Sequence, residues 1–133
     1  VVYAWIRGGD GRYLLTKRSP NKGYPNMWEC TGGSALAGDD SLTAALREVR
    51  EETGLRLDPM RGRRVASHRV AGRFEDVWLF ERDVALDELT LQEGETCGAM
   101  LTRADEILEL RREGRMAPTG SFELAELLKL MEG

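Results

Sequence analysis

The segment DDSLTAALREVREETGL, residues 39–55, constrains the fold most, because it has the pattern of one complete amphipathic helix. Side chains three and four positions apart share a face of an α-helix. On that spacing one face is apolar, and it consists of Leu42, Ala45, Leu46, Val49 and Thr53. Ser41 is the expected N-cap and Gly54 the expected end of the helix. A helix with a single apolar face requires a second layer, which the flanking strand-like segments predict to be a β-sheet.

Strand-like segments precede and follow this helix. The runs VVYAWI and RYLLTKR are separated by GGDG, which is typical of a hairpin turn. Residues 19–27 are rich in Pro, Gly and Asn and are expected to form a surface loop. The expected strands cover residues 1–6, 12–18, 28–31, 65–72, 74–84 and 96–102, and two further helices are expected at about 103–113 and 120–131. This order predicts an α/β (α+β) fold with a central mixed sheet.

Length and composition restrict the classes of function. A chain of 133 residues suits one domain, residues 1–133, with its own core. No apolar run is long enough to span a membrane, and 32% charged residues indicate a soluble protein without a membrane partner. The net charge of −4 argues against binding a nucleic acid duplex, because duplex phosphates require a basic surface.

Two features bear on where the chain functions and where it starts. Cys30 and Cys97 lie far apart and form no CxxC motif, which favours a reducing cytoplasm over a secreted domain built on disulfides. The sequence begins at Val1, inside a strand-like segment and without a methionine. We therefore expect the natural start to lie upstream.

Three glutamates gather beside the apolar face of the 39–55 helix. Glu48, Glu51 and Glu52 fall within an arc of about 100°, where like charges weaken an isolated helix. Arg47 can pair with Glu51 four residues on, but one guanidinium does not neutralise three carboxylates. A hard divalent cation such as Mg²⁺ would, since it prefers oxygen ligands completed by water and substrate phosphate. For the helix taken alone, the alternative is a solvated, charge-rich surface.

The residues around these glutamates follow a known pattern. Gly33 is followed by five residues and Asp39, and then by seven residues and the run REVREETGL, residues 47–55. This stretch resembles the signature of the Nudix hydrolase family, G-x5-E-x7-R-E-U-x-E-E-x-G-U, in which U is an aliphatic residue. Eight of its nine specified positions match, and the exception is Asp39, where the family has glutamate. The resemblance implies the family's α/β/α sandwich and a hydrolase.

The resemblance also implies roles for individual residues. The ligands of Mg²⁺ or Mn²⁺ would be Glu48, Glu51 and Glu52. Arg47 would orient these glutamates, Gly33 would permit a tight turn, and Gly54 would end the helix. Asp39 keeps the charge of glutamate but is one methylene shorter, so we expect its contact with the metal or with Arg47 to become water-mediated. Leu36 stands where many relatives carry another glutamate.

The implied chemistry is hydrolysis of a diphosphate linkage. A metal ion neutralises phosphate oxygens and lowers the pKa of bound water, and a spare carboxylate accepts the proton as water attacks phosphorus. The base stays open between Glu48 and Glu95, because the family's base sometimes comes from a later loop and Glu95 is the positional match in LQEGETCG. An exposed loop acid is the alternative for Glu95. The implied substrate is a small, nucleotide-like molecule: a nucleoside diphosphate linked to another group.

Two other functions are weighed against this one. The stretch WECTGG resembles the isopentenyl-diphosphate isomerase branch of the superfamily. That enzyme needs a cysteine where this sequence has Gly32, and Cys30 lies two residues earlier. A nucleotide sensor without activity is disfavoured by the three intact glutamates. Specificity is expected in loops 19–27 and 84–98, and the oligomeric state stays open, with a homodimer as one alternative because dimers are frequent among relatives.

Overall fold

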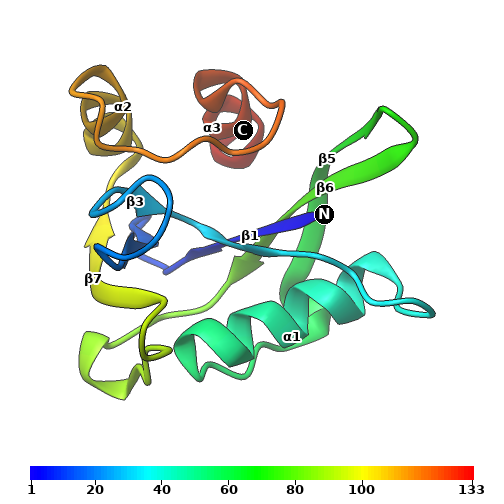
Figure 1. The fold of residues 1–133 in the computed structure, drawn as a ribbon, viewed down its shortest axis with the longest axis horizontal. Coiled ribbons are helices and arrows are strands. Elements are labelled where there is room, and N and C mark those ends of the chain that lie inside the picture. The colour runs from blue at the N-terminus through cyan, green and yellow to red at the C-terminus, as the bar shows by residue number, and fades with distance from the viewer.

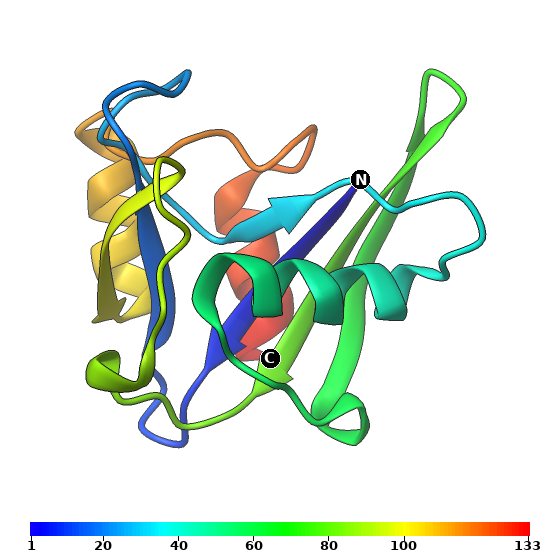
Figure 2. The same cartoon turned by 60° about the horizontal axis from the view of Figure 1, so that its bottom comes forward.

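One mixed sheet lies between two layers of helices. The computed structural model describes the backbone of residues 1–133 and the side chains of residues 1–69 and 71–133. Helix α1 covers one face of the sheet, and α2 and α3 cover the other (Figures 1 and 2). The helices are α1 (Ser41–Thr53), α2 (Ala104–Arg112) and α3 (Leu124–Glu132), with short 3₁₀ turns η1 (Pro59–Arg61) and η2 (Leu86–Glu88). The predicted fold class, with a central mixed sheet, is confirmed.

The sheet has seven strands and one parallel pairing. The strands are β1 (Val2–Arg7), β2 (Tyr13–Arg18), β3 (Trp28–Glu29), β4 (Thr31–Gly33), β5 (Gly62–Val70), β6 (Arg73–Glu81) and β7 (Thr96–Thr102). The main order is β3-β2-β1-β6-β5, and β4 pairs with β1 while β7 pairs with β2. Only the β1–β6 pairing is parallel among the described strands. Every predicted strand is therefore present.

The strand predicted at residues 28–31 is divided in two. Strands β1 and β2 share one partnered position, Arg7 with Tyr13, and then diverge. Strand β3 pairs with β2 and β4 pairs with β1, so the chain crosses from one to the other at Cys30. The expectation of one continuous strand was wrong because the divergence of β1 from β2 leaves no single partner for it. A cavity lies beside this crossing.

Alternation along the strands produces two hydrophobic clusters, one on each face of the sheet. In β1, Val2, Ala4 and Ile6 face α1, whereas Trp5 faces α2 and α3. The cluster under α1 includes Ala45 and Val49 of the predicted apolar face, and both are fully buried. Burial of such side chains contributes about 1.5–3 kcal/mol each for a residue the size of valine or leucine. This packing fixes which side of α1 carries its glutamates.

The caps of α1 confirm one prediction and correct another. Gly54 ends the helix with φ of 78°, and its N–H donates to Arg50 O at 2.9 Å. The N-cap is Asp40, whose Oδ1 accepts from the Thr43 N–H at 2.7 Å, so the prediction of Ser41 was wrong. Ser41 is instead the first helical residue, and its Oγ accepts from Trp78 Nε1 at 2.7 Å. That bond to β6 sets the register of the first turn.

The last helix begins later than predicted. Helix α3 starts at Leu124, and the side chain of Glu123 caps it by accepting from the Glu126 N–H at 3.0 Å. Residues 117–122 instead form an irregular segment in which the Ser121 N–H donates to Glu75 Oε2 at 2.9 Å. Glu75 is a buried residue of β6, so its carboxylate attaches this segment to the sheet.

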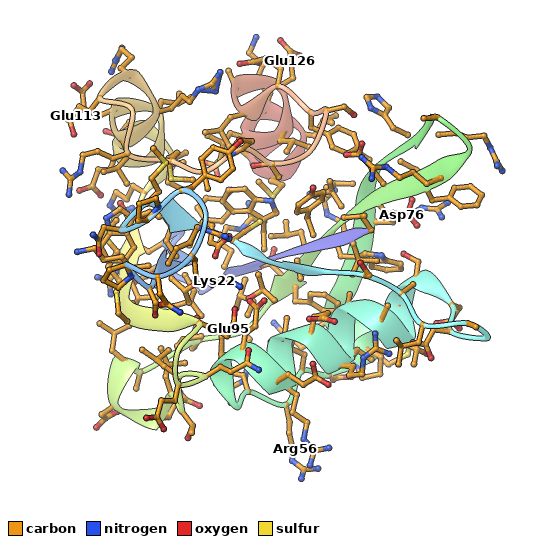
Figure 3. The ribbon with its side chains drawn as sticks, in the orientation of Figure 1. Lys22, Arg56, Asp76, Glu95, Glu113 and Glu126 are labelled. Carbon is orange, nitrogen blue, oxygen red and sulfur yellow. The ribbon has the colours of Figure 1, made fainter. Side chains whose placement is uncertain are left out.

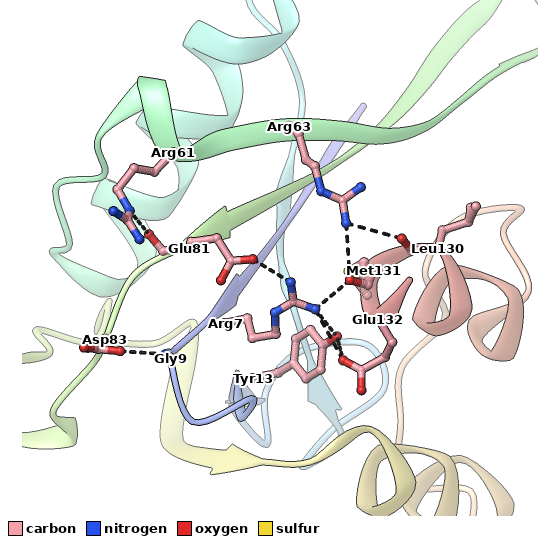
Figure 4. Close-up of polar contacts among 10 residues, drawn as sticks. All are labelled: Arg7, Gly9, Tyr13, Arg61, Arg63, Glu81, Asp83, Leu130, Met131 and Glu132. Atoms are coloured by element: carbon pink, nitrogen blue, oxygen red, sulfur yellow. Dashed lines mark hydrogen bonds and ion pairs between the residues drawn. The ribbon is translucent and has the colours of Figure 1, made fainter.

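Two arginines fix the end of α3 to the sheet (Figure 4). Arg7 Nη1 donates to Met131 O at 2.6 Å, and Arg63 Nη2 donates to the same carbonyl at 3.2 Å. Arg7 also pairs with Glu81 at 2.5 Å. Cationic groups at a helix C-terminus satisfy its free carbonyls and oppose its dipole.

Among the described residues, no helix combines the length and hydrophobicity needed to cross a membrane.

Candidate functional site

A cavity of about 460 Å³ lies beside the crossing from β3 to β4. Its walls come from α1, the 19–27 loop, the turn before β7 and the 117–122 segment. The charged side chains among its lining residues are Arg18, Lys22, Glu29, Glu52 and Glu95. Three acids and two bases therefore face one space of the size that commonly holds a small ligand.

Glu52 is the cavity acid that lacks a cationic partner among the described side chains. Burial, followed by the nearby charges of Glu29 and Glu48, raises the pKa of its carboxyl to about 8. Hydrogen bonding to the Thr31 side chain and the Gly32 backbone acts in the opposite direction. A buried carboxylate in an acidic surrounding favours a proton or a bound cation. This residue is the strongest single candidate for a metal ligand.

Glu48 packs against the backbone of β4. Its side chain is 16% exposed, and burial is the main cause that raises the pKa of its carboxyl, followed by Glu51. A Cβ placed on Gly33 would lie 2.2 Å from Glu48 Cδ. Gly33 ends β4 without a positive φ, so the prediction that it allows a tight turn was wrong. Its missing side chain provides the space in which the Glu48 carboxylate lies.

Arg47 connects the start of α1 to the glutamates. It forms a direct ion pair with Asp39, and its Nη2 donates to Ser34 O at 3.1 Å. The same guanidinium lies 3.7 Å from Glu48 Oε1 and 4.0 Å from Glu51 Oε1. The expectation of a water-mediated contact between Asp39 and Arg47 was therefore wrong, because the loop before α1 brings the shorter side chain close enough. The Asp39–Arg47 pair holds the pKa of Asp39 below its usual value.

The three predicted ligands do not all face the cavity. Glu52 lines it, Glu48 lies at its edge against Gly33, and the Glu51 side chain is 54% exposed. Among the described side chains, no group of three acids, histidines or cysteines is placed to hold a metal ion together. The chemistry of the three glutamates still fits a hard divalent cation, because they offer carboxylate oxygens. In addition, no described cationic side chain pairs with Glu52.

Glu95 faces the cavity from the turn before β7. Its side chain pairs with Lys22 of the 19–27 loop, and Figure 3 shows the two residues close together. The Ser19 N–H donates to Glu95 O at 3.1 Å, which joins the two segments through their backbones. Glu93, two residues before Glu95, is exposed and does not line the cavity. The structure thus places Glu95 at the cavity, and its role as the base stays a prediction.

Sequence reasoning missed Glu29. This acid lines the cavity and accepts from Arg18 Nη1 at 2.9 and 3.2 Å, while Arg18 Nε donates to Gly23 O at 2.6 Å. A signal existed, because Glu29 follows Trp28 in a strand and alternation places the two on opposite faces. Trp28 packs against the cluster under α2 and α3, so Glu29 points to the α1 side.

The far wall of the cavity was also missed. Tyr3 of β1 and the segment from Ala117 to Gly120 form it. Gly120 has φ of 58°, and a Cβ placed there would lie 2.0 Å from Glu75 Oε2 and 2.7 Å from the Tyr3 hydroxyl. Burial, followed by the charge of Glu75, raises the pKa of Tyr3. These residues are more than 40 positions apart, so only the folded chain brings them together.

The comparisons with known proteins agree with the observed fold. The NUDIX domain model matches residues 1–121. A Nudix hydrolase of Listeria monocytogenes, lmo0368, is 38% identical over 132 residues, which cover 98% of this chain and 77% of that protein. The crystal structure of DR0079 from Deinococcus radiodurans superposes with a TM-score of 0.76 at 25% identity, covering 96% of this chain and 79% of that one. The nucleoside triphosphatase NudI of Salmonella agona is 45% identical over 49 residues, or 36% of this chain and 35% of that protein.

Proposed function

Because this chain belongs to the Nudix hydrolase family, we propose that it is a Mg²⁺-dependent pyrophosphohydrolase that cleaves a nucleoside diphosphate linked to another group. The observation that carries the proposal is Glu52, a partly buried acid with no cationic partner among the described side chains, which faces a cavity containing Glu29 and Glu95. The family signature supplies Glu48 and Glu51 on the same helix. Mn²⁺ has the same preference for oxygen ligands and is the alternative ion.

Each side chain has a distinct part in the proposed reaction. Glu48, Glu51 and Glu52 would hold the ion, which supplies charge neutralisation at the phosphate oxygens and a lower pKa of bound water. Arg47 holds Glu48 in place through its ion pair with Asp39 and its contact with Ser34. Arg18, fixed by Glu29, presents a guanidinium to the cavity, where it would bind a phosphate oxygen.

Glu95 is our proposed base. Its side chain lines the cavity, whereas the Glu48 carboxylate is packed against Gly33. A carboxylate at this position would accept a proton from the water that attacks phosphorus. The leaving phosphate would depart with the electrons of the broken P–O bond. Glu48 stays the alternative base, and loss of activity in Glu48→Gln with full activity in Glu95→Gln would favour it.

A nucleotide-like substrate is supported by the cavity and by one relative. The volume of about 460 Å³ lies in the range of pockets that hold small molecules. Tyr3 and Tyr24 provide aromatic rings at its walls, which suits a planar base. The local match to the nucleoside triphosphatase NudI supports the same substrate class.

Cys30 and Cys97 are free thiols, which supports a reducing cytoplasm as the site of action.

A panel of substrates tests this proposal. Purified protein would be assayed for release of phosphate, diphosphate and mononucleotides from nucleotides, nucleotide sugars, dinucleoside polyphosphates and isoprenoid diphosphates, with and without Mg²⁺. Glu52→Gln should lower kcat by about 10² or more, because it removes an ionised ligand. The matched control is Glu113→Gln, which removes an exposed acid outside this cavity.

The outcomes separate the proposed function from its alternatives. Magnesium-dependent release from one nucleotide class, lost in Glu52→Gln and kept in Glu113→Gln, supports the hydrolase. Double-bond migration in an isoprenoid diphosphate without hydrolysis would favour the isomerase. The structure argues against that outcome, because burial raises the pKa of the Cys30 thiol well above its ordinary value. Saturable nucleotide binding without turnover would favour the sensor.

A further inference from the structure

The two cationic side chains of the cavity are both paired with acids, but unequally. Arg18 makes two contacts with Glu29 and a third with the carbonyl of Gly23. Among the described side chains, Lys22 pairs with one acid, Glu95. Its side chain is 32% exposed and that of Glu95 is 44% exposed, so solvent screens the pair. Arg18 is therefore fixed, whereas Lys22 can change its partner at little cost.

The backbones that carry Lys22 and Glu95 are held together. The Ser19 N–H donates to Glu95 O at 3.1 Å, and the Lys22 N–H donates to Ser19 O at 3.1 Å. On the other side, the Glu95 N–H donates to Gln92 O at 3.1 Å. Because both turns are closed by hydrogen bonds, a change of partner needs rotation of side chains and no movement of a loop.

We propose that Lys22 leaves Glu95 to bind a phosphate of the substrate, and that this exchange of partners releases Glu95 for catalysis. In the free enzyme Lys22 pairs with Glu95, and with substrate bound Lys22 pairs with a diphosphate oxygen. A diphosphate carries more negative charge than one carboxylate and so competes well for the ammonium group. This inference rests on the proposed function, since it assigns Glu95 the part of the base.

The exchange couples substrate binding to the proton transfer. While Lys22 donates to Glu95, the ammonium group occupies that carboxylate oxygen, so the oxygen is not available to accept a proton from water. Once Lys22 has moved, a water O–H bond breaks as the new O–P bond forms, and Glu95 takes the proton. The bridging P–O bond breaks, and the leaving phosphate takes the electron pair. Charges and atoms balance without a further reactant.

Binding measurements test the exchange without relying on turnover. Imidodiphosphate, a diphosphate analogue with a bridging nitrogen, would be titrated calorimetrically in Mg²⁺ into the wild type, Lys22→Met, Glu95→Gln and the double variant. Lys22→Met should weaken binding about tenfold, and Glu95→Gln should tighten it by about threefold or more, because it removes the competitor for Lys22. Lys22→Arg keeps the charge and should restore most of the affinity.

The double variant decides between exchange and a general effect of charge. If Glu95 acts by occupying Lys22, Glu95→Gln should change the affinity less than about twofold when Lys22 is already methionine. Equal tightening in both backgrounds would overturn the proposal, and so would the absence of imidodiphosphate binding to the wild type. Glu93→Gln, which removes an exposed acid two residues away, is the matched control and should leave the affinity unchanged.

Turnover separates this proposal from the proposed function. Under the exchange, Lys22→Met should raise KM for the substrate more than it lowers kcat, whereas Glu95→Gln should lower kcat while it tightens binding. If the Lys22 and Glu95 substitutions are coupled in imidodiphosphate binding but no substrate is hydrolysed, the exchange is supported and the hydrolase is contradicted. If hydrolysis depends on magnesium but the two substitutions have additive effects on binding affinity, the hydrolase is supported and the exchange is contradicted.

Discussion

Gly33→Ala should abolish most activity while leaving the fold intact. The added Cβ would lie 2.2 Å from Glu48 Cδ and 2.4 and 2.6 Å from its two carboxylate oxygens. An ordinary contact is at least 3.4 Å, so the carboxylate must move by about 1 Å or more. A misplacement of this size costs roughly 10²-fold in rate, which corresponds to about 2.7 kcal/mol of transition-state stabilisation.

The stability of the same variant should change little. Gly33 lacks a positive φ, so alanine fits its backbone without strain. Alanine also lowers the conformational entropy of the unfolded chain, which stabilises the folded protein by about 0.4–1 kcal/mol. The atoms that it meets belong to the end of a flexible side chain, which can rotate away. We expect the free energy of unfolding, measured with urea, to stay within about 1 kcal/mol of the wild type.

A matched variant and a double variant complete the assay. Gly98→Ala adds the same methyl group to another strand of the sheet, where the nearest atom lies at 3.5 Å, and should keep full activity. Gly33→Ala should cost little more in a Glu48→Ala background, because the displaced carboxylate is then absent. A full additional loss of about 10² in that background would refute the reasoning, since the methyl group would then act directly on the substrate.

Three further predictions follow from the caps and charges of α1. Asp40→Ala should lower the free energy of unfolding by about 1 kcal/mol in urea titrations, since Asp40 rather than Ser41 accepts from the Thr43 N–H. Asp39→Glu should keep kcat within a few-fold and retain the ion pair with Arg47, and a loss of 10² would show that the shorter side chain is required. Burial raises the pKa of Glu52 from 4.5 to about 8, so this carboxyl is protonated in the folded protein and ionised in the unfolded chain between these values. In EDTA, Tm should therefore fall as pH rises through this window and the slope should flatten in Glu52→Gln; equal slopes would contradict the assignment.

Local patterns predicted most of the fold. The apolar face of residues 39–55 and the alternation in the strands are set by side chains a few positions apart, and both faces pack as expected. The N-cap was misplaced by one residue because Asp40 and Ser41 are both good caps. The choice depends on Trp78, almost 40 residues later, whose indole N–H donates to Ser41.

Local patterns predicted only the part of the site that lies on one helix. The positions of the glutamates on α1 follow from the helix period, whereas Glu95 was expected from the family resemblance alone. The far wall depends on contacts between Tyr3, Glu75 and Gly120, which no local pattern encodes. The partnering of Lys22 with Glu95 likewise depends on how two loops meet, and that is decided by the Ser19 backbone bond.

The most direct measurement is the rate of diphosphate hydrolysis by the wild type and Glu52→Gln as the Mg²⁺ concentration is varied. The account predicts a rate that saturates with Mg²⁺ in the wild type, and in Glu52→Gln a kcat lower by about 10² together with a higher Mg²⁺ requirement. Equal rates in the two proteins, or hydrolysis that persists in EDTA, would contradict the claim that the acids of α1 form a metal-dependent hydrolase site.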